Sequence, residues 1–95
     1  MKLFVDDLRE CPEGWELART INEAIRILAT GYVEEVSLDY DIRCNHNTKK
    51  PHCCETFEAV AYYIAKIDYL PIIHYHTGNI LGKQKMTDIL KSRLI

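Results

Sequence analysis

The sequence lacks the features that define several large classes of protein. It has no apolar run near the ~18 residues of a membrane span. Its 12 lysines and arginines are outnumbered by 14 aspartates and glutamates, and the net charge of −2 argues against general polyanion binding. It has no internal repeat and no low-complexity segment. Its first residues, 1–7, reach acid too soon for a signal peptide, so we expect a cytoplasmic protein without membrane association.

The composition that is present is that of one small folded domain. A chain of 95 residues buries a modest core. Its hydrophobic content of 47% and charged content of 27% fit a globular rather than a disordered chain. We therefore expect a single domain over residues 1–95. The apolar faces of so short a chain leave room for a homodimer.

Four cysteines do not by themselves define a disulfide or zinc framework. Without a secretory signal, we expect reduced thiols. Three of the four, Cys44, Cys53 and Cys54, lie near two histidines in a polar insertion over residues 43–54. Their spacing matches no standard zinc finger or ribbon, so we expect free thiols there rather than zinc. An insertion of this length in a small domain is often functional.

Short apolar runs and helical spacing predict the order β-β-α-β-α-β-α. The expected strands cover residues 2–5, 15–19, 35–39 and 72–75. The expected helices follow the capping box Thr20-Ile21-Asn22-Glu23, resume near Thr56, and cover residues 82–94. Helices between the later strands imply right-handed crossovers and a small, mainly parallel α/β sheet of about four strands with flanking helices.

Polar residues follow three of the predicted strands. Ligands of parallel α/β sheets bind at the carboxyl ends of strands, near the point where the strand order reverses. The residues that reach this edge are Asp6, Asp7, Asp39, Asp41, His74 and His76. Aspartates also end strands and cap turns without any further role, but the whole set at one edge favours a functional site.

The aspartates and histidines of this edge suit phosphate chemistry. Asp6, Asp7 and Asp39 would repel one another unless a cation or a proton lies among them, and Mg²⁺ accepts such carboxylates while leaving positions for phosphate oxygens. His74 and His76 alternate along a strand and share one face. They can serve as acid and base near pH 7, or bind a metal.

The turn after the last strand is the expected phosphate-binding element. Backbone N–H groups at a helix start favour an anion. Thr77, Asn79, Lys83 and Lys85 follow the histidines and are the candidate phosphate ligands. The pattern GxxxxGK[ST] of a P-loop is absent.

These residues together resemble a known family. The segments 3–9, 14–15, 37–41 and 74–79, with Gly82 and Met86, are similar to the cyclic-phosphate processing receiver domains, which derive from the receiver domains of response regulators. The resemblance implies a receiver-type, flavodoxin-like fold and a role on cyclic phosphates in RNA repair or nucleotide signalling. The chain departs from ordinary receivers in having room for four strands rather than five, and it lacks the lysine after a fifth strand.

Two main hypotheses follow. In the first, the domain is a phosphodiesterase that opens cyclic phosphates of RNA ends or cyclic nucleotides, with His74, His76 and Asp39 as catalytic residues. In the second, it is a non-catalytic module that senses or sequesters cyclic nucleotides. A phosphoacceptor role for Asp39, as in phosphorelay receivers, is a third reading, against which the missing lysine argues.

Overall fold

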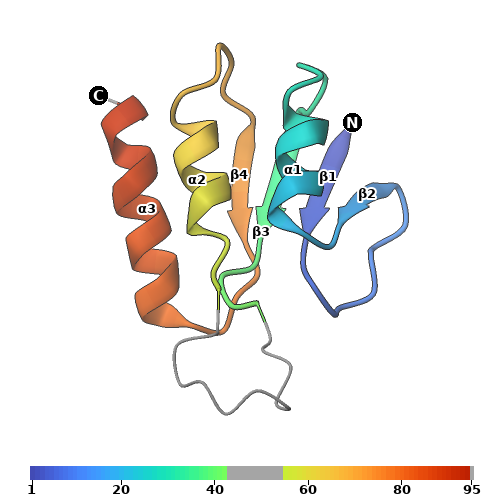
Figure 1. The fold of residues 1–95 in the computed structure, drawn as a ribbon, viewed down its shortest axis with the longest axis horizontal. Coiled ribbons are helices and arrows are strands. Elements are labelled where there is room, and N and C mark those ends of the chain that lie inside the picture. The colour runs from blue at the N-terminus through green and yellow to red at the C-terminus, as the bar shows by residue number, and fades with distance from the viewer. Residues whose placement is uncertain (43–54, 95) are drawn as a thin grey trace.

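Four parallel strands form the sheet in the part of the chain that the structure describes. The computed structural model describes residues 1–42 and 55–94 (Figure 1). The strands are β1 (Lys2–Val5), β2 (Trp15–Ala18), β3 (Glu35–Leu38) and β4 (Ile72–Tyr75). Their order in the sheet is β2-β1-β3-β4, and every neighbouring pair is parallel. This confirms the small parallel α/β sheet of receiver type, with β2 at an edge.

Three helices pack side by side in one layer against the sheet. They are α1 (Ile21–Leu28), α2 (Glu58–Ile64) and α3 (Ile80–Leu94). Helix α1 connects β2 to β3, and α2 connects β3 to β4. Both connections move in the same direction across the sheet, so right-handed crossovers put both helices on the same face. Figure 1 shows α1 in front of the strands, α2 next to β4, and α3 on the outer side of α2.

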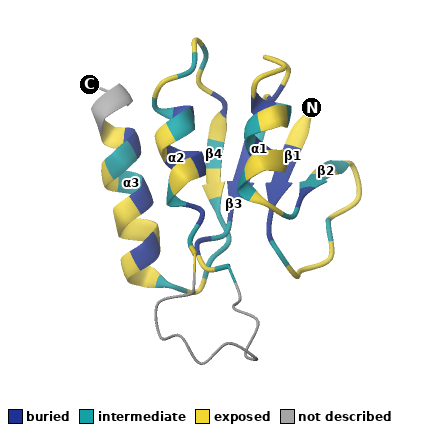
Figure 2. Ribbon diagram, in the orientation of Figure 1, coloured by how far each residue is buried: buried dark blue, intermediate teal, exposed yellow. Residues whose placement is uncertain are grey.

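The two faces of the sheet differ in burial. Leu3, Val5, Val36 and Leu38 alternate along β1 and β3 and have no exposed surface, because the helices cover them. The residues between them point to the other face, which no helix of the described residues covers. Exposure rises there from the centre of the sheet to the edge strand β4, where Ile72 is 60% exposed (Figure 2).

Helix α1 begins as the capping box predicts. The Thr20 hydroxyl accepts a hydrogen bond from the Glu23 backbone N–H at 3.1 Å, and a Glu23 carboxylate oxygen accepts one from the Arg19 N–H at 3.1 Å. The helix buries Ala24 and Leu28 against the sheet. The chain leaves it through Gly31, whose φ of +81° favours glycine.

Helix α3 begins two residues earlier than the sequence predicts. The Asn79 side-chain oxygen accepts a hydrogen bond from the Gly82 N–H at 2.9 Å, so Asn79 caps a helix that starts at Ile80. Gly82 then lies against the ring of Tyr40. A Cβ at this position would come within 2.3 Å of two ring carbons, so only glycine allows α3 to approach this closely. The Tyr40 hydroxyl is fixed in turn by Glu58, at 2.6 Å.

Two further expectations concern regions away from the sheet. Within residues 1–42 and 55–94, no helix has the length and hydropathy that crossing a membrane requires. The insertion over residues 43–54, with the prediction of free thiols rather than zinc, lies outside the described residues.

Candidate functional site at the carboxyl ends of the strands

A cavity of about 510 Å³ lies where the strands end, within the usual size range of ligand pockets. Its walls come from three segments: residues 6–9 after β1, Asp39 and Asp41 after β3, and residues 77–79 after β4. The topology makes this convergence possible, because the parallel strands β1, β3 and β4 all end at the same edge. The aspartates predicted to gather at this edge lie together.

Asp6 is the most buried group of the site, with 1% of its surface exposed. One carboxylate oxygen accepts hydrogen bonds from the backbone N–H groups of Leu8 and Arg9, both at 2.9 Å. The other oxygen lies 2.9 Å from His76 Nε2 and 3.8 Å from Arg9 Nε. Burial alone would raise the pKa of Asp6, but the two backbone hydrogen bonds and His76 outweigh it and lower the pKa. Asp6 is therefore a fixed negative charge.

Asp39 is the less satisfied carboxylate of the pair. The structure gives it a hydrogen bond from the Tyr40 backbone N–H at 2.8 Å. Burial and the neighbouring charge of Asp6 outweigh that bond and raise the pKa of Asp39. Two adjacent carboxyl groups whose pKa values shift in opposite directions are typical of functional sites. Asp39 is the carboxyl that gains a proton, or a cation, more readily than an ordinary aspartate.

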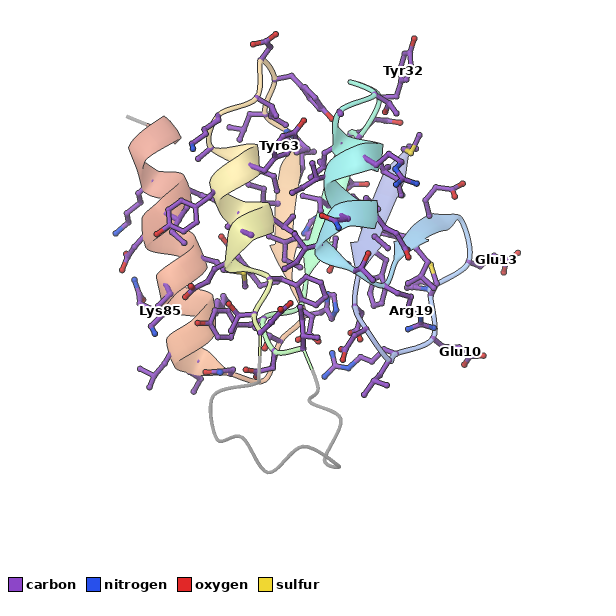
Figure 3. The ribbon with its side chains drawn as sticks, viewed as in Figure 1. Glu10, Glu13, Arg19, Tyr32, Tyr63 and Lys85 are labelled. Carbon is purple, nitrogen blue, oxygen red and sulfur yellow. The ribbon has the colours of Figure 1, made fainter. Side chains whose placement is uncertain are left out.

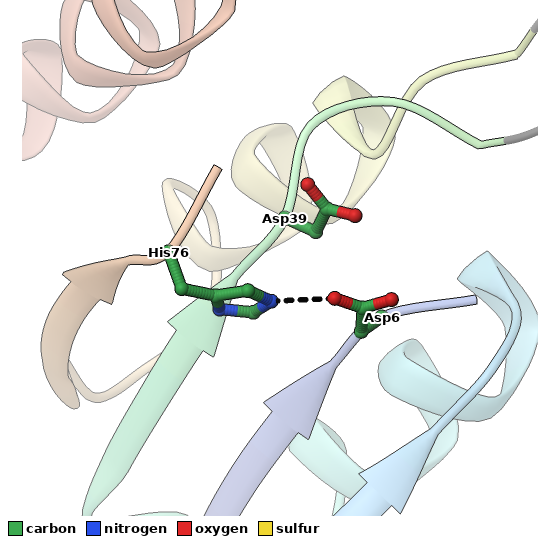
Figure 4. Close-up of side chains that lie close together, drawn as sticks. All are labelled: Asp6, Asp39 and His76. Atoms are coloured by element: carbon green, nitrogen blue, oxygen red, sulfur yellow. Dashed lines mark hydrogen bonds and ion pairs between the residues drawn. The ribbon is translucent and has the colours of Figure 1, made fainter. Parts of the chain in front are cut away.

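His76 is held on three sides beside these carboxylates (Figure 4). Its Nε2 contacts Asp6, and its Nδ1 lies 2.7 Å from the Ser37 hydroxyl oxygen. Its ring stacks on Phe4, with centroids 4.3 Å apart and planes 11° apart. When the imidazole is neutral, ionised Asp6 accepts the Nε2 hydrogen and the Ser37 hydroxyl donates to Nδ1. Both ring nitrogens are therefore in use.

Two arginines fix the loop after β1. Arg9 Nη1 donates to the backbone oxygen of His76, which ties this loop to the end of β4. Arg19 Nη1 donates to the backbone oxygen of Arg9 at 2.8 Å. Arg9 is the cationic side chain among the described residues that line the cavity, and four aspartates surround it. The lining of the cavity is therefore strongly acidic.

The turn after β4 lines the cavity but uses part of its own polar groups. The Asn79 backbone N–H donates to the Thr77 hydroxyl at 3.1 Å. The Asn79 amide nitrogen donates to Asp41 at 3.2 Å, while its oxygen caps α3. Thr77 and Asn79 thus stand at the cavity as predicted, and their binding of phosphate stays a prediction.

Besides His76, which reaches the site through Asp6, three predicted site residues lie outside the lining of the cavity. His74 shares a face with His76, but it is 48% exposed and its Nε2 contacts Glu35 at 3.1 Å. Lys83 Nζ lies 5.7 Å from the centre of the Tyr75 ring. Lys85 projects from the outer side of α3 (Figure 3). Their roles stay predictions that this geometry does not support, so the proposals below do not use them.

Sequence reasoning missed Ser37, Arg9 and Phe4 as parts of the site. Ser37 carried a signal: it is a polar residue between the apolar Val36 and Leu38 of β3, and it is 7% exposed in the structure. Parallel register places it beside Phe4 on β1 and His74 on β4. Arg9 and Phe4 could not be found in this way, because their contacts to His76 join residues more than sixty positions apart.

The donor set for a cation differs from the predicted one. Asp6, Asp39 and His76 each offer a ligand atom, and these atoms lie within 4.8 Å of one another. Within the described residues, Asp7 lines the cavity but does not belong to this group. Bonds of about 2.0–2.2 Å from a metal reach ligand atoms ~4 Å apart, so small side-chain adjustments close the site. The residues fit a divalent cation, with one nitrogen and two carboxylates as donors.

Comparison with known proteins identifies the family of the chain. The family model of the cyclic-phosphate processing receiver domain matches residues 1–92. The chain belongs to this family. The match extends over all the strand ends that build the cavity of this receiver domain, and it confirms the resemblance seen in the sequence. No curated protein and no solved structure matches the chain.

Proposed function

We propose that this receiver domain binds a cyclic phosphate in its cavity and hydrolyses it to a phosphomonoester. The observation that carries the proposal is the pair Asp6 and Asp39, whose neighbouring carboxyl groups have pKa values shifted in opposite directions. They stand at a cavity whose volume of about 510 Å³ suits a mononucleotide-sized ligand. Family membership supports the substrate class.

An acidic cavity needs a cation before it takes an anionic substrate. Asp6 and Asp39 would share a divalent cation, Mg²⁺ or another, which would offset their charge and polarise a phosphate oxygen. Arg9, from the same wall segment as Asp6, contributes a positively charged side chain to the cavity. Arg9 is 56% exposed at its side chain, so it can reach a phosphate oxygen at the cavity mouth.

The reaction needs one proton acceptor and one proton donor. A water oxygen attacks phosphorus, and the bond from phosphorus to one ring ester oxygen breaks. A cation held by Asp6 and Asp39 would lower the pKa of a water bound beside them, so that the water loses its proton to solvent without a side-chain base. The departing oxygen takes a proton from solvent and becomes a hydroxyl. His76 has no free ring nitrogen for this transfer, so its contribution is to hold Asp6.

The substrate is a nucleoside 2′,3′-cyclic phosphate, an RNA end of that kind, or a cyclic nucleotide. Each presents a phosphodiester with one negative charge, which suits a site with one cation and one arginine. The exposed Leu8 at the cavity wall offers an apolar surface to a base or ribose.

A second candidate function is binding without turnover. The observation that favours it is His76, which is occupied at both nitrogens and leaves the cavity without an acid–base pair of histidines. A domain that sequesters or senses a cyclic nucleotide needs the same cavity but no proton transfer.

Mass spectrometry of bound and free nucleotides separates the two functions. Purified protein is incubated with a panel of 2′,3′-cyclic phosphates and cyclic nucleotides, with divalent cation and with chelator. Hydrolysis yields a product heavier by one water. We expect Asp39→Asn to lower turnover by about 10-fold to 100-fold or more, because it removes a carboxylate that would hold the cation.

The matched control is His74→Ala, which changes a histidine outside the cavity. Hydrolysis that persists in Asp39→Asn at the wild-type rate contradicts the role of Asp39 as a ligand of the catalytic cation. Ligand that is retained and released unchanged by the wild-type protein contradicts hydrolysis and supports the binding function.

A further inference from the structure

In each residue of the group Asp6, Asp39 and His76, one polar atom forms hydrogen bonds to residues outside the group. Asp6 accepts two backbone N–H groups at one carboxylate oxygen. Asp39 accepts the Tyr40 N–H at one oxygen, at 2.8 Å, and His76 Nδ1 lies 2.7 Å from the Ser37 hydroxyl. The other oxygen of Asp6 and His76 Nε2 contact each other at 2.9 Å, and both become available to a shared ligand once the Nε2 hydrogen moves to Nδ1. This division of atoms is characteristic of metal ligands, whose other atoms are held by hydrogen bonds that set their orientation.

The surroundings of His76 supply an independent observation. Metal-bound histidines almost always donate their second ring N–H to an oxygen of the protein. The Ser37 hydroxyl oxygen lies 2.7 Å from His76 Nδ1, and Ser37 is 7% exposed. A serine hydroxyl can accept as well as donate, so it serves Nδ1 in either tautomer. Stacking on Phe4 keeps the ring plane fixed while the proton changes place.

We propose that Asp6, Asp39 and the Nε2 atom of His76 form a mixed nitrogen–oxygen metal site, oriented by Ser37, that prefers Mn²⁺ or Zn²⁺ to Mg²⁺. This inference deepens the proposed function, since it specifies the cation of the same site. It differs from the all-carboxylate Mg²⁺ site that the sequence predicts, because His76 takes the place of Asp7.

When the metal binds, the imidazole ring neither gains nor loses a hydrogen overall. In the metal-free protein, Nε2–H donates to Asp6 and the Ser37 hydroxyl donates to Nδ1. On binding, Nε2 loses its hydrogen and Nδ1 gains one, and Ser37 becomes the acceptor. The imidazole stays neutral throughout, so this exchange releases no net proton. The Asp6 oxygen that had accepted Nε2–H becomes available to the metal at the same time.

The choice of metal follows from the donor atoms. Mg²⁺ takes oxygen ligands and keeps much of its hydration, whereas an imidazole nitrogen suits softer divalent ions. Two carboxylates with one imidazole is a donor set for Mn²⁺ and Zn²⁺. Mn²⁺ is the better probe, because thiolates such as those of the cysteines favour Zn²⁺.

The test measures Mn²⁺ alone, without nucleotide. We expect calorimetry to give Mn²⁺ at least ~10-fold tighter binding than Mg²⁺. Electron spin-echo spectroscopy of bound Mn²⁺ should show the nitrogen coupling of a coordinated imidazole. His76→Gln should abolish that coupling, while His74→Gln, its matched control, keeps it. Ser37→Ala should keep the coupling and weaken Mn²⁺ binding by about 10-fold or more.

Two outcomes overturn the inference. Equal affinity for Mg²⁺ and Mn²⁺ excludes a nitrogen ligand that selects the metal, and bound Mn²⁺ without nitrogen coupling excludes His76 directly. The wild-type spectrum decides the second point even where a variant misfolds. Because no nucleotide is present, a protein that binds Mn²⁺ through His76 but hydrolyses no cyclic phosphate sustains this inference while the proposed hydrolysis fails.

Discussion

The two faces of the sheet use alternate residues of the same strands for different purposes. On the face covered by helices, Val36 and Leu38 of β3 have no exposed surface and contact only the core. On the open face, Ser37 lies between them and bonds to His76. One face therefore stabilises the fold, and the other carries polar groups to the strand ends.

The face of the sheet that no helix of the described residues covers itself contains two different environments. Near its carboxyl edge, His76 is 17% exposed at its side chain and bonds to a buried carboxylate. Two residues earlier on the same face, His74 is 48% exposed and bonds to Glu35 at the surface. A difference of two positions along β4 thus separates a residue of the site from a residue of the surface, because only the strand ends reach the cavity.

The largest expected effect tests the covered face. Leu38→Ala removes a side chain with no exposed surface, so we expect the free energy of unfolding to fall by about 2–5 kcal/mol. Urea unfolding followed by circular dichroism measures this loss. A loss below ~1 kcal/mol would show that the helix layer packs less tightly on the sheet than the burial of Leu38 indicates.

The next largest effect on stability tests the close contact between α3 and Tyr40, which brings the helix layer near the site. Gly82→Ala places a Cβ against the Tyr40 ring, and overpacking of this kind costs about 1–3 kcal/mol. The companion variant is Tyr40→Leu, which removes the ring. If the clash is the cause, Gly82→Ala should cost less in the Tyr40→Leu background than in the wild-type protein. Equal costs in both backgrounds would assign the loss to something other than this contact.

Sequence reasoning reached the local features of this fold and missed those that depend on distant contacts. The capping box at Thr20 and the short apolar runs of the strands are local, and both were predicted correctly. The start of α3 was predicted two residues late, because Gly82 looked like part of the turn. Glycine is required at position 82 because α3 packs against Tyr40, a residue forty-two positions away in the sequence. No local sequence pattern contains that information.

In the candidate site too, local sequence patterns predicted some features, whereas contacts between distant residues determined the others. The ends of three strands could be predicted to meet, because parallel strands end at one edge. Which histidine reaches the carboxylates could not, because the period of two gives His74 and His76 the same face. Their difference arises from register: His74 lies beside Ser37 on β3, whereas His76 lies beyond the last paired residue of β4 and reaches Asp6.

A smaller effect is expected in the pH dependence of stability, which tests the two carboxylates at the strand ends. The raised pKa of Asp39 means that the folded protein holds the proton of the Asp39 carboxyl group more tightly than the unfolded chain does. Ionised Asp39 therefore costs stability, and this cost appears as pH rises from the ordinary value of 3.8 through the folded pKa. We expect Asp39→Asn to raise stability at pH 7 by about 1 kcal/mol and to leave it unchanged near pH ~3.

Asp6 should behave in the opposite way. Its lowered pKa gives a stabilisation that is present above 3.8 and is lost as pH falls through the folded pKa. Asp6→Asn should therefore lower stability at pH 7, and the difference from the wild-type protein should shrink in acid. Urea unfolding at several pH values measures both variants. The same sign for both would contradict the opposite shifts on which the proposed function rests.

The smallest expected effect tests the division between the two histidines. His74→Ala removes an exposed side chain with a surface ion pair, so we expect Tm to change by less than about 4 °C and turnover of a cyclic phosphate by less than about twofold. The alanine leaves no buried group without a partner, because Glu35 is partly exposed and keeps its contact with Lys2 at 3.4 Å. His76→Ala differs in this respect: it leaves the buried oxygen of Asp6 without its His76 partner and removes the ring from Phe4. A loss of turnover in His74→Ala comparable to that in His76→Ala would extend the site along the open face and restore the paired role that the sequence predicts for the two histidines.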